Sequence, residues 1–297
     1  MLRFYPFFSP KVSVHAVNYF LIAQNFAIFS MFANLPEQNQ HENHMNYFDV
    51  NEKVVLITGS SRGLGNTLAK GFASAGSTVV LNGMDPGRLD SAVNTLKTVS
   101  STVYGYPFDV SDYESVKNII PTIEEQVGPI DILINNAGIH RRAPLSEMTM
   151  EEWSQVIQIN LNAVFYISQQ VANRMISRKK GKIINISSLN AEGARPAIAN
   201  YCSAKGGLNA LTRSMAAEWG PHNIQTNGIG PGYFKTDLTR VLADNPEFDA
   251  WVRQEVPLQR WGDPEELVGT AIYLASRASD YVNGFTIYVD GGWRSSL

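Results

Sequence analysis

Residues 53–65 read KVVLITGSSRGLG, a short apolar run that leads through three glycines into a stretch with helical apolar spacing. The run Val54–Ile57 is typical of a strand that is buried on both faces. Glycines at this turn would let the backbone approach a dinucleotide pyrophosphate, which also gains from unpaired N–H groups at a helix N-terminus. A tight turn without a ligand is the alternative. We predict cofactor contacts from Gly59, Ser61, Arg62, Gly63, Leu64 and Gly65.

The same order of elements repeats along the rest of the chain. Apolar strands joined by helical crossovers predict a parallel sheet that helices cover on both faces. No linker rich in Pro, Gly or Ser divides the region. Residues 45–297 are therefore predicted to form one α/β domain, a doubly wound Rossmann-type fold with a parallel sheet flanked by helices. The seven β-rich runs are KVVLITG, STVVLNG, TVYGYPFDV, PIDILINNAG, KIINISS, NIQTNGIGPG and FTIYVDGG.

Residues 1–44 form an N-terminal extension of a different character. No Asp, Glu, Lys or Arg occurs from Val12 to Leu35, which is typical of a membrane or export segment. Several Asn and Gln residues interrupt this stretch and make burial in lipid costly. Two interpretations stay open: a membrane anchor, or an upstream extension read from a mis-assigned start codon. Membrane contact is expected only if the extension is retained.

The composition excludes several classes of function. Basic and acidic residues are mixed along the chain and the formal net charge is −3, so no run of phosphates would be neutralised and nucleic-acid binding is not expected. Cys202 is the single cysteine, which leaves no internal disulfide and no cysteine-based zinc site. We expect no metal and a reducing compartment, the cytoplasm.

The end of the second strand indicates which cofactor is used. Residues 81–84 read Leu-Asn-Gly-Met, so no carboxylate stands where an NAD-binding site would hold the ribose hydroxyls. Arg62 and Arg88 are placed to meet a ribose phosphate instead. Asp85 precedes Pro86 and is expected to cap the next helix. NADP(H) is therefore favoured over NAD(H).

A second set of residues predicts a proton-transfer site. Tyr201 and Lys205 are four residues apart and share one face of a predicted helix, where an ammonium can lower the pKa of a phenol. Ser188 ends the predicted strand KIINIS, so its hydroxyl can point into the crevice at the carboxyl ends of the strands. Together the three groups could hold a carbonyl oxygen and move a proton to it.

These motifs and several others resemble the short-chain dehydrogenases/reductases, over nearly all of residues 46–297. The matching signatures fall in the order that this family has. They are TGSSRGLG at the first turn, Asp109-Val110, Asn135-Asn136-Ala137-Gly138, Asn160, Ser188, Tyr201 to Lys205, and Pro231-Gly232.

The resemblance implies a role for each matching residue. Tyr201 would be the general acid in carbonyl reduction and the general base in alcohol oxidation, and Ser188 would orient the substrate oxygen. Lys205 would hold the nicotinamide ribose and lower the pKa of Tyr201, and Asn160 would fix a water that relays protons. Cofactor contacts are implied at Asn135, Ala137 and Gly138 near the adenosine ribose, Asp109 and Val110 near the adenine, and Pro231, Gly232 and Thr236 near the nicotinamide.

Substrate choice is expected at the rim of the crevice, where residues 140–142 read His-Arg-Arg. A guanidinium binds a carboxylate in a bidentate way, so Arg141 and Arg142 suit an acidic substrate beside Ser188 and Tyr201. A solvated basic loop is the alternative. The run NNAGIHRRAP also resembles the gluconate 5-dehydrogenases within the family. This resemblance implies interconversion of D-gluconate and 5-keto-D-gluconate.

Other functions remain open on the same fold. Reduction of a 3-oxoacyl thioester or another ketone would use the same catalytic residues. A non-catalytic protein that senses NADPH would need the Rossmann turn alone. The run YVNGFTIYVDGGW resembles the family's last strand and tail, which implies a homotetramer.

The stretch Asp237–Val256 resembles the part of the family that covers the substrate. Lys235, just before it, could add a positive contact or face water. Tyr233, Trp251 and Trp261 could form apolar walls of the site or pack internally.

Overall fold

The seven runs predicted as strands pair into one parallel sheet in the order β3-β2-β1-β4-β5-β6-β7. The computed structural model describes residues 46–236 and 239–296, so both interpretations of residues 1–44 lie outside the described residues. Val55 in the centre of the sheet pairs with Val79 on one side and Ile132 on the other. The strands are β1 (Val54–Ile57), β2 (Thr78–Gly83), β3 (Val103–Pro107), β4 (Ile132–Asn135), β5 (Gly181–Ile186), β6 (Ile224–Pro231) and β7 (Thr286–Val289).

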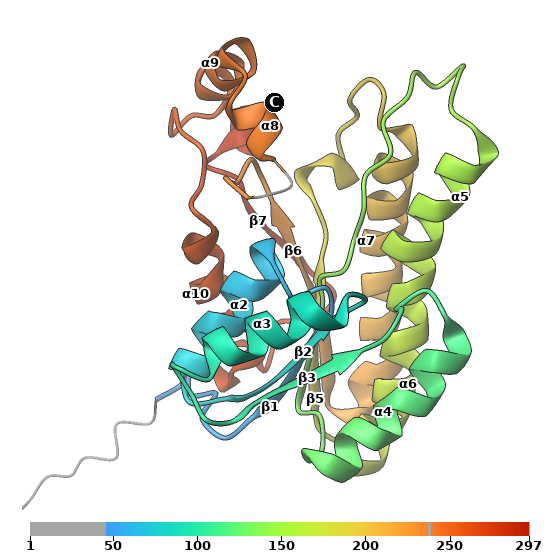
Figure 1. Cartoon of the computed structure of the whole chain (residues 1–297), viewed down its shortest axis with the longest axis vertical. Coiled ribbons are helices and arrows are strands. Elements are labelled where there is room, and N and C mark those ends of the chain that lie inside the picture. The colour runs from blue at the N-terminus through green and yellow to red at the C-terminus, as the bar shows by residue number, and fades with distance from the viewer. Residues whose placement is uncertain (1–45, 237–238, 297) are drawn as a thin grey trace, which may run out of the picture. The chain divides into compact units, whose positions relative to one another are not determined.

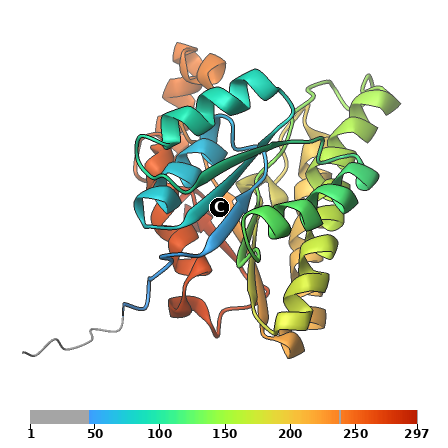
Figure 2. The same cartoon turned by 60° about the horizontal axis from the view of Figure 1, so that its bottom comes forward.

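Alternation along β1 divides the core into two layers. Val55 and Ile57 belong to the apolar cluster under α2, α3 and α10, whereas Val54 and Leu56 belong to the cluster under α4 and α6. Figures 1 and 2 show these two sets of helices on opposite faces of the sheet. The fold prediction is therefore confirmed. The helices of the two layers are α2 (Gly63–Ser74), α3 (Pro86–Leu96), α4 (Tyr113–Gln126), α5 (Met150–Ile157), α6 (Ala163–Arg178), α7 (Ala199–Trp219) and α10 (Val268–Ala275).

Side-chain caps explain why several helices begin where they do. Asp85 accepts the backbone N–H of Arg88 and caps α3, with Pro86 as its first residue, as the sequence predicted. Thr149 and Glu152 form a reciprocal capping box at the start of α5. Between α5 and α6 the helix widens into a π turn, η1 (Gln158–Asn162), which contains Asn160.

The chain order reverses at β1, which lies between β2 and β4. Open α/β sheets bind ligands outside the carboxyl ends of the strands at such a switch point. Beyond β6, the short helices α8 (Arg240–Ala243) and α9 (Pro246–Glu255) form a third apolar cluster with Trp261 and Trp293. In the part of the chain that the structure describes, no helix is both long and apolar enough to cross a bilayer.

Candidate active site

A cleft of about 590 Å³ runs along the carboxyl ends of the strands. Its walls come from the turns after β1, β2, β3, β4, β5 and β6, and from the N-terminal half of α7. Segments that are far apart in the sequence therefore meet at one edge of the sheet, as the parallel arrangement requires. The cleft contains the predicted catalytic residues Ser188, Tyr201 and Lys205.

The glycine turn after β1 has the shape that a pyrophosphate needs. Gly59 has a φ of +60°, and its N–H donates to the side chain of Asn82 at 3.1 Å. A Cβ on Gly65 would lie 2.4 Å from the amide nitrogen of Asn136 and 2.6 Å from the carbonyl oxygen of Gly59. No side chain caps the N-terminus of α2. The turn thus presents backbone N–H groups at close range, and these fit a dinucleotide phosphate.

Most of the residues predicted to contact the cofactor line this cleft. Gly65 does not, because it lies behind the turn and lets α2 pack close to Asn136. The predicted cofactor residues that do line the cleft are Gly59, Ser61, Arg62, Gly63, Leu64, Asp109, Val110, Ala137, Gly138, Tyr201, Lys205, Pro231, Gly232 and Thr236.

The expectation for Asn135 is corrected by its position. Asn135 is the last residue of β4, and its amide donates to Ser168 and Asn185 beneath the cleft. Successive side chains of a strand point to opposite sides, so the next residue, Asn136, faces the cleft instead. Asn136 also bonds the carbonyl groups of Thr58 and Gly59 and holds the glycine turn against β4.

At the adenosine end, Asn82 is turned inward. Its amide bonds Gly59 on one side and the carbonyl of Phe108 on the other, so it ties three strand ends together. Arg62, Met84 and Arg88 line the cleft beside it. The carboxylate of Asp85 also lies there, but one of its oxygens caps α3 and the other is 3.6 Å from the guanidinium of Arg88.

The predicted catalytic residues come together around the end of β5. Burial raises the pKa of Tyr201 to about 12, while a hydrogen bond with Ser188 acts to lower it. Burial lowers the pKa of Lys205 to about 8. The Lys205 ammonium donates to the carbonyl of Ile186 at 2.6 Å and lies 5.8 Å from the centre of the Tyr201 ring.

Ser188 is the group that acts to lower the pKa of Tyr201, while the Lys205 ammonium is bonded to the backbone of β5. The lowering of this pKa by Lys205 stays a prediction. Burial therefore keeps the phenol of Tyr201 protonated at neutral pH. A protonated phenol in the same cleft as the hydroxyl of Ser188 is suited to donate a proton to a carbonyl oxygen.

Asn160 is placed differently from its expected role as a water ligand. The side chain is fully buried, and both ends of its amide bond the backbone of Ile139, each at 2.8 Å. It does not line the cleft. A Cβ on Gly138 would lie 3.0 Å from the Asn160 oxygen, which explains the glycine there. The Asn160 side chain is therefore a positioning residue for the loop after β4, and the water relay stays a prediction.

His140 packs directly on Tyr201 and was not assigned a role from the sequence. The two rings are stacked with centroids 3.7 Å apart. Burial, together with the charges of Arg142 and Lys205, lowers the pKa of His140 to about 4. The ring is therefore neutral at neutral pH, and its buried Nδ1 has no hydrogen-bond partner among the described residues.

The two adjacent arginines at the rim point in different directions, which corrects the expected clamp. Arg141 bonds the side chain of Gln155 and the carbonyl of His140, and it does not line the cleft. Arg142 does line it. Adjacent side chains in a loop need not face the same way, and here one member of the pair reaches the cleft.

Arg195 also lines the cleft and was not identified from the sequence. It is the single arginine between Ser188 and Tyr201, and this place between two catalytic residues is the signal that could have revealed it. Its guanidinium donates to the hydroxyl of Tyr233 and lies 4.3 Å from the ring centre of Trp251.

Of the three aromatic residues predicted as possible walls of the site, one lines the cleft and the others pack in the apolar cluster around α9. Tyr233 lines the cleft, whereas Trp261 is buried in the cluster around α9, where its indole N–H donates to Asp249 at 2.8 Å. Trp251 packs edge to face on Tyr233. Asp237 and Leu238, which open the expected covering stretch, lie outside the described residues.

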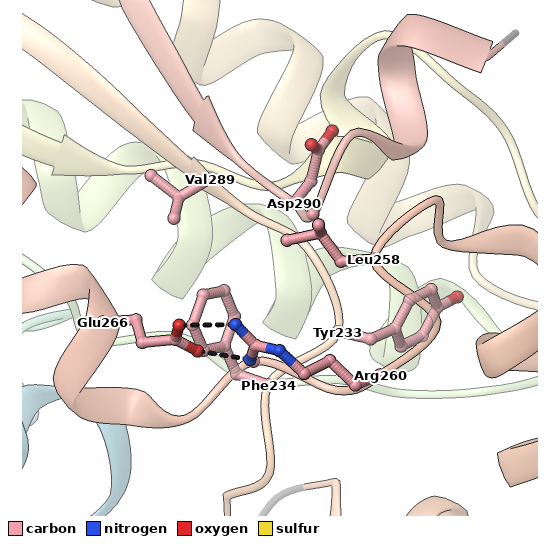
Figure 3. Close-up of a pocket in the computed structure, with 9 residues that line it drawn as sticks. Tyr233, Phe234, Leu258, Arg260, Glu266, Val289 and Asp290 are labelled. Atoms are coloured by element: carbon pink, nitrogen blue, oxygen red, sulfur yellow. Dashed lines mark hydrogen bonds and ion pairs between the residues drawn. The ribbon is translucent and has the colours of Figure 1, made fainter.

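A second, smaller cavity of about 90 Å³ lies beside this cluster (Figure 3). Arg260 and Glu266 form a two-pronged ion pair at 2.7 Å along one side of it, and Phe234, Leu258 and Val289 supply apolar walls. The cavity is too small for a sugar acid, and its one lining guanidinium, Arg260, is already paired with Glu266. We therefore place the substrate in the larger cleft.

Comparison with known proteins identifies the family. A family model described as enoyl-(acyl carrier protein) reductase matches residues 59–294. The chain belongs to the short-chain dehydrogenase/reductase family. This short-chain dehydrogenase/reductase is accordingly an NAD(P)-dependent oxidoreductase that acts on CH–OH groups.

Relatives of this short-chain dehydrogenase/reductase carry more specific names. It is 48% identical to a gluconate 5-dehydrogenase of Gluconobacter oxydans over 254 residues, which cover 86% of this chain and 99% of the relative. It is 46% identical to a 2-dehydro-3-deoxy-D-gluconate 5-dehydrogenase of Formosa agariphila, with 82% and 94% covered. A crystal structure of a gluconate 5-dehydrogenase from Burkholderia cenocepacia in complex with NADP and tartrate superposes with a TM-score of 0.82 at 44% identity, covering 84% of this chain and 98% of the other.

Proposed function

We propose that this enzyme interconverts a sugar acid and its keto form with NADP(H), and that the pair is D-gluconate and 5-keto-D-gluconate. The observation that carries the proposal is the combination in one cleft of the Ser188–Tyr201–Lys205 set with guanidinium groups at the rim. Guanidinium groups suit the carboxylate that distinguishes a sugar acid from a neutral ketone. Relatives with sugar-acid names at 46–48% identity support the same substrate class.

In the reduction, a bound nicotinamide would supply a hydride to the carbonyl carbon. The protein's part is to hold the carbonyl oxygen and to deliver a proton to it. The Ser188 hydroxyl would hydrogen-bond that oxygen, and the neutral phenol of Tyr201 would donate its proton to it. In the oxidation the same phenolate oxygen would take the proton back. Lys205 would contact the nicotinamide ribose from the floor of the cleft.

The NADP preference rests on charge at the adenosine end. Arg62 and Arg88 line the cleft there, and the carboxylate of Asp85 is engaged at the cap of α3. Two guanidinium groups would hold a ribose phosphate, whereas no free carboxylate is placed to hold ribose hydroxyls. The structure of the 44% identical Burkholderia enzyme contains NADP, which supports this choice.

The proposal is tested by following nicotinamide absorbance with purified protein. D-Gluconate and 5-keto-D-gluconate are each supplied with NADP(H) and with NAD(H). We expect turnover with both acids and a higher kcat/KM with NADP(H). Activity on a neutral ketone or a 3-oxoacyl thioester, with none on either acid, would reject the substrate and leave the catalytic residues in place. Tight NADPH binding without turnover of any substrate would indicate a sensor.

We also propose that the protein is a homotetramer and that it lies in the cytoplasm. A homotetramer follows from family resemblance alone, and light scattering of the purified protein tests it. Cys202 is a free thiol beside Tyr201, which fits the reducing conditions of the cytoplasm. Among the described residues, no group of three or more His, Cys, Asp and Glu could hold a metal ion.

A further inference from the structure

Arg195 is a half-buried cation in the cleft whose charge no described carboxylate balances. The residue lies in the loop after η2 (Leu189–Ala191), and its side chain reaches the cleft wall. None of the ion pairs among the described residues includes it. Burying a guanidinium without an anion is costly unless a ligand provides one or aromatic faces hold it.

Aromatic rings fix the position of this guanidinium without consuming its charge. Its central carbon lies 4.3 Å from the ring centre of Trp251 and 5.2 Å from that of Phe248, both in α9. One of its N–H groups donates to the hydroxyl of Tyr233. A guanidinium has five N–H donors, and among the described residues one hydrogen bond of Arg195 is seen, so its other donors are available to an anion.

Arg142 supplies a second cation in the same cleft. It comes from the loop after β4, whereas Arg195 comes from the loop after β5, and both line the same cleft. Both charges act on the phenol of Tyr233, where they oppose the rise in its pKa that burial causes. Arg142 also acts on His140, which is stacked on Tyr201. Both cations therefore lie near Tyr233, and Arg142 also lies within electrostatic reach of His140 beside the catalytic tyrosine.

We propose that Arg195 and Arg142 together form the subsite that binds the substrate's carboxylate, with the aromatic residues of α9 holding Arg195 in place. The inference rests on the proposed function and names the residues that select an acid. It replaces the adjacent pair Arg141 and Arg142 by a pair from two different loops. Two guanidinium groups that bond the same carboxylate would fix the orientation of the acid as well as raise its affinity.

The experiment compares Arg195→Ala, Arg195→Lys and Arg142→Ala with the matched control Arg141→Ala, which removes a rim arginine outside the cleft. Reduction of 5-keto-D-gluconate and of a neutral ketone is measured with NADPH. For the keto acid we expect KM to rise about 10-fold to 100-fold in the Arg195 and Arg142 variants, the range for loss of a charge-assisted hydrogen bond. Kinetics on the neutral ketone, and all kinetics of the Arg141 variant, should stay within about twofold of the wild type.

A binding measurement without turnover separates this inference from the proposed function. Tartrate is titrated by calorimetry into NADP-saturated wild type and variants. Binding that is lost in Arg195→Ala and weakened in Arg195→Lys supports the subsite, even if the wild type reduces neither sugar acid. Equal tartrate binding and unchanged KM for the keto acid in both Arg195 variants would overturn it, while wild-type turnover of the acid would keep the proposed function. Thermal melts establish that each variant folds, and Arg195→Lys keeps the comparison available if Arg195→Ala does not.

Discussion

The phenol of Tyr201 is the group whose removal tests the chemistry most directly. Tyr201→Phe deletes one oxygen and retains the ring that stacks on His140. Because general acid–base catalysis contributes about 10²-fold to 10⁴-fold, we expect kcat to fall by that range while NADP(H) binding is retained. The measurement is kcat together with cofactor affinity by calorimetry. Cys202→Ala is the adjacent control and should keep its activity, and undiminished turnover in Tyr201→Phe would refute the assignment.

His140 makes the stability of the protein depend on pH in a predictable direction. Folding lowers the pKa of His140 from its ordinary value near 6.5 to about 4, so the folded state favours the neutral ring. The unfolded chain then binds more protons than the folded chain between pH 6.5 and 4, and stability falls as the pH is lowered through that window. His140→Phe keeps a ring on Tyr201 and removes the titration.

The check is the melting temperature of the wild type and of His140→Phe at several pH values from 7.5 to about 4. The difference between their melting temperatures should shift in favour of the variant as the pH falls below 6.5. Parallel curves for the two proteins over this range would show that His140 is not a source of the acid sensitivity.

At single residues, the sequence predicts the position of a group best where a motif fixes both the residue and its neighbours. The structure brings Ser188, Tyr201 and Lys205 into one cleft, as a strand end and a helical spacing of four predict, and their catalytic roles stay predictions. Arg141 and Asn135 do not line the cleft, because the side chain of Arg141 bonds Gln155 and that of Asn135 bonds Ser168, and a motif does not encode which way a side chain turns. Arg195 was missed because its neighbours in space come from α9, more than fifty positions further along the chain.

At the scale of elements, the junction between β1 and α2 depends on a glycine that makes no contact with the cleft. A Cβ at Gly65 would meet the backbone oxygen of Gly59 at 2.6 Å, which no side-chain movement can relieve. We expect Gly65→Ala to cost about 1–3 kcal/mol of unfolding free energy and to weaken NADP(H) binding, because α2 must shift away from the turn. Chemical denaturation and cofactor titration measure the two effects.

Gly269 in α10 is the matched control, because a Cβ there meets no atom within 4 Å. Gly269→Ala should be neutral or stabilise the protein by up to about 1 kcal/mol, since alanine favours helix more than glycine does. If both substitutions had the same small effect, close packing at the β1–α2 turn would not be what requires Gly65.

The order of strands and helices followed from the sequence because buried parallel strands leave continuous apolar runs of distinctive length. The cap of α3 at Asp85 followed for a similar local reason. The region of α8 and α9 carries no such signal. Its helices are short and are held by an aromatic cluster with Trp293, close to the C-terminus. The conformation of this region depends on packing between segments that are distant in the sequence, so a local sequence pattern does not predict it.

On the scale of the whole molecule, a chain of polar contacts connects the C-terminal segment to the catalytic loop. Arg294, in the last 3₁₀ turn η6 (Trp293–Ser296), pairs with Glu192 in the loop that follows Ser188. The hydroxyl of Tyr288 in β7 donates to Glu192 at 2.7 Å and accepts from Asn209 at 2.9 Å. Asn209 in turn accepts from the hydroxyl of Ser187 at 2.6 Å.

Tyr288 is the link in that chain whose removal separates positioning from catalysis. Tyr288→Phe leaves the buried amide of Asn209 without one of its partners, which costs about 1–3 kcal/mol of stability. If these polar contacts also hold Ser187 and Ser188 in place after β5, kcat should fall by about 3-fold to 10-fold. A small misplacement of a group that holds the reacting oxygen slows the chemical step. Tyr281→Phe is the control, since Tyr281 is fully exposed and both its stability and its turnover should match the wild type. Lower stability with unchanged kcat would show that these polar contacts only hold β7 in place. A fall in kcat at a temperature where the variant is fully folded would show that the C-terminal segment helps to align the catalytic serine.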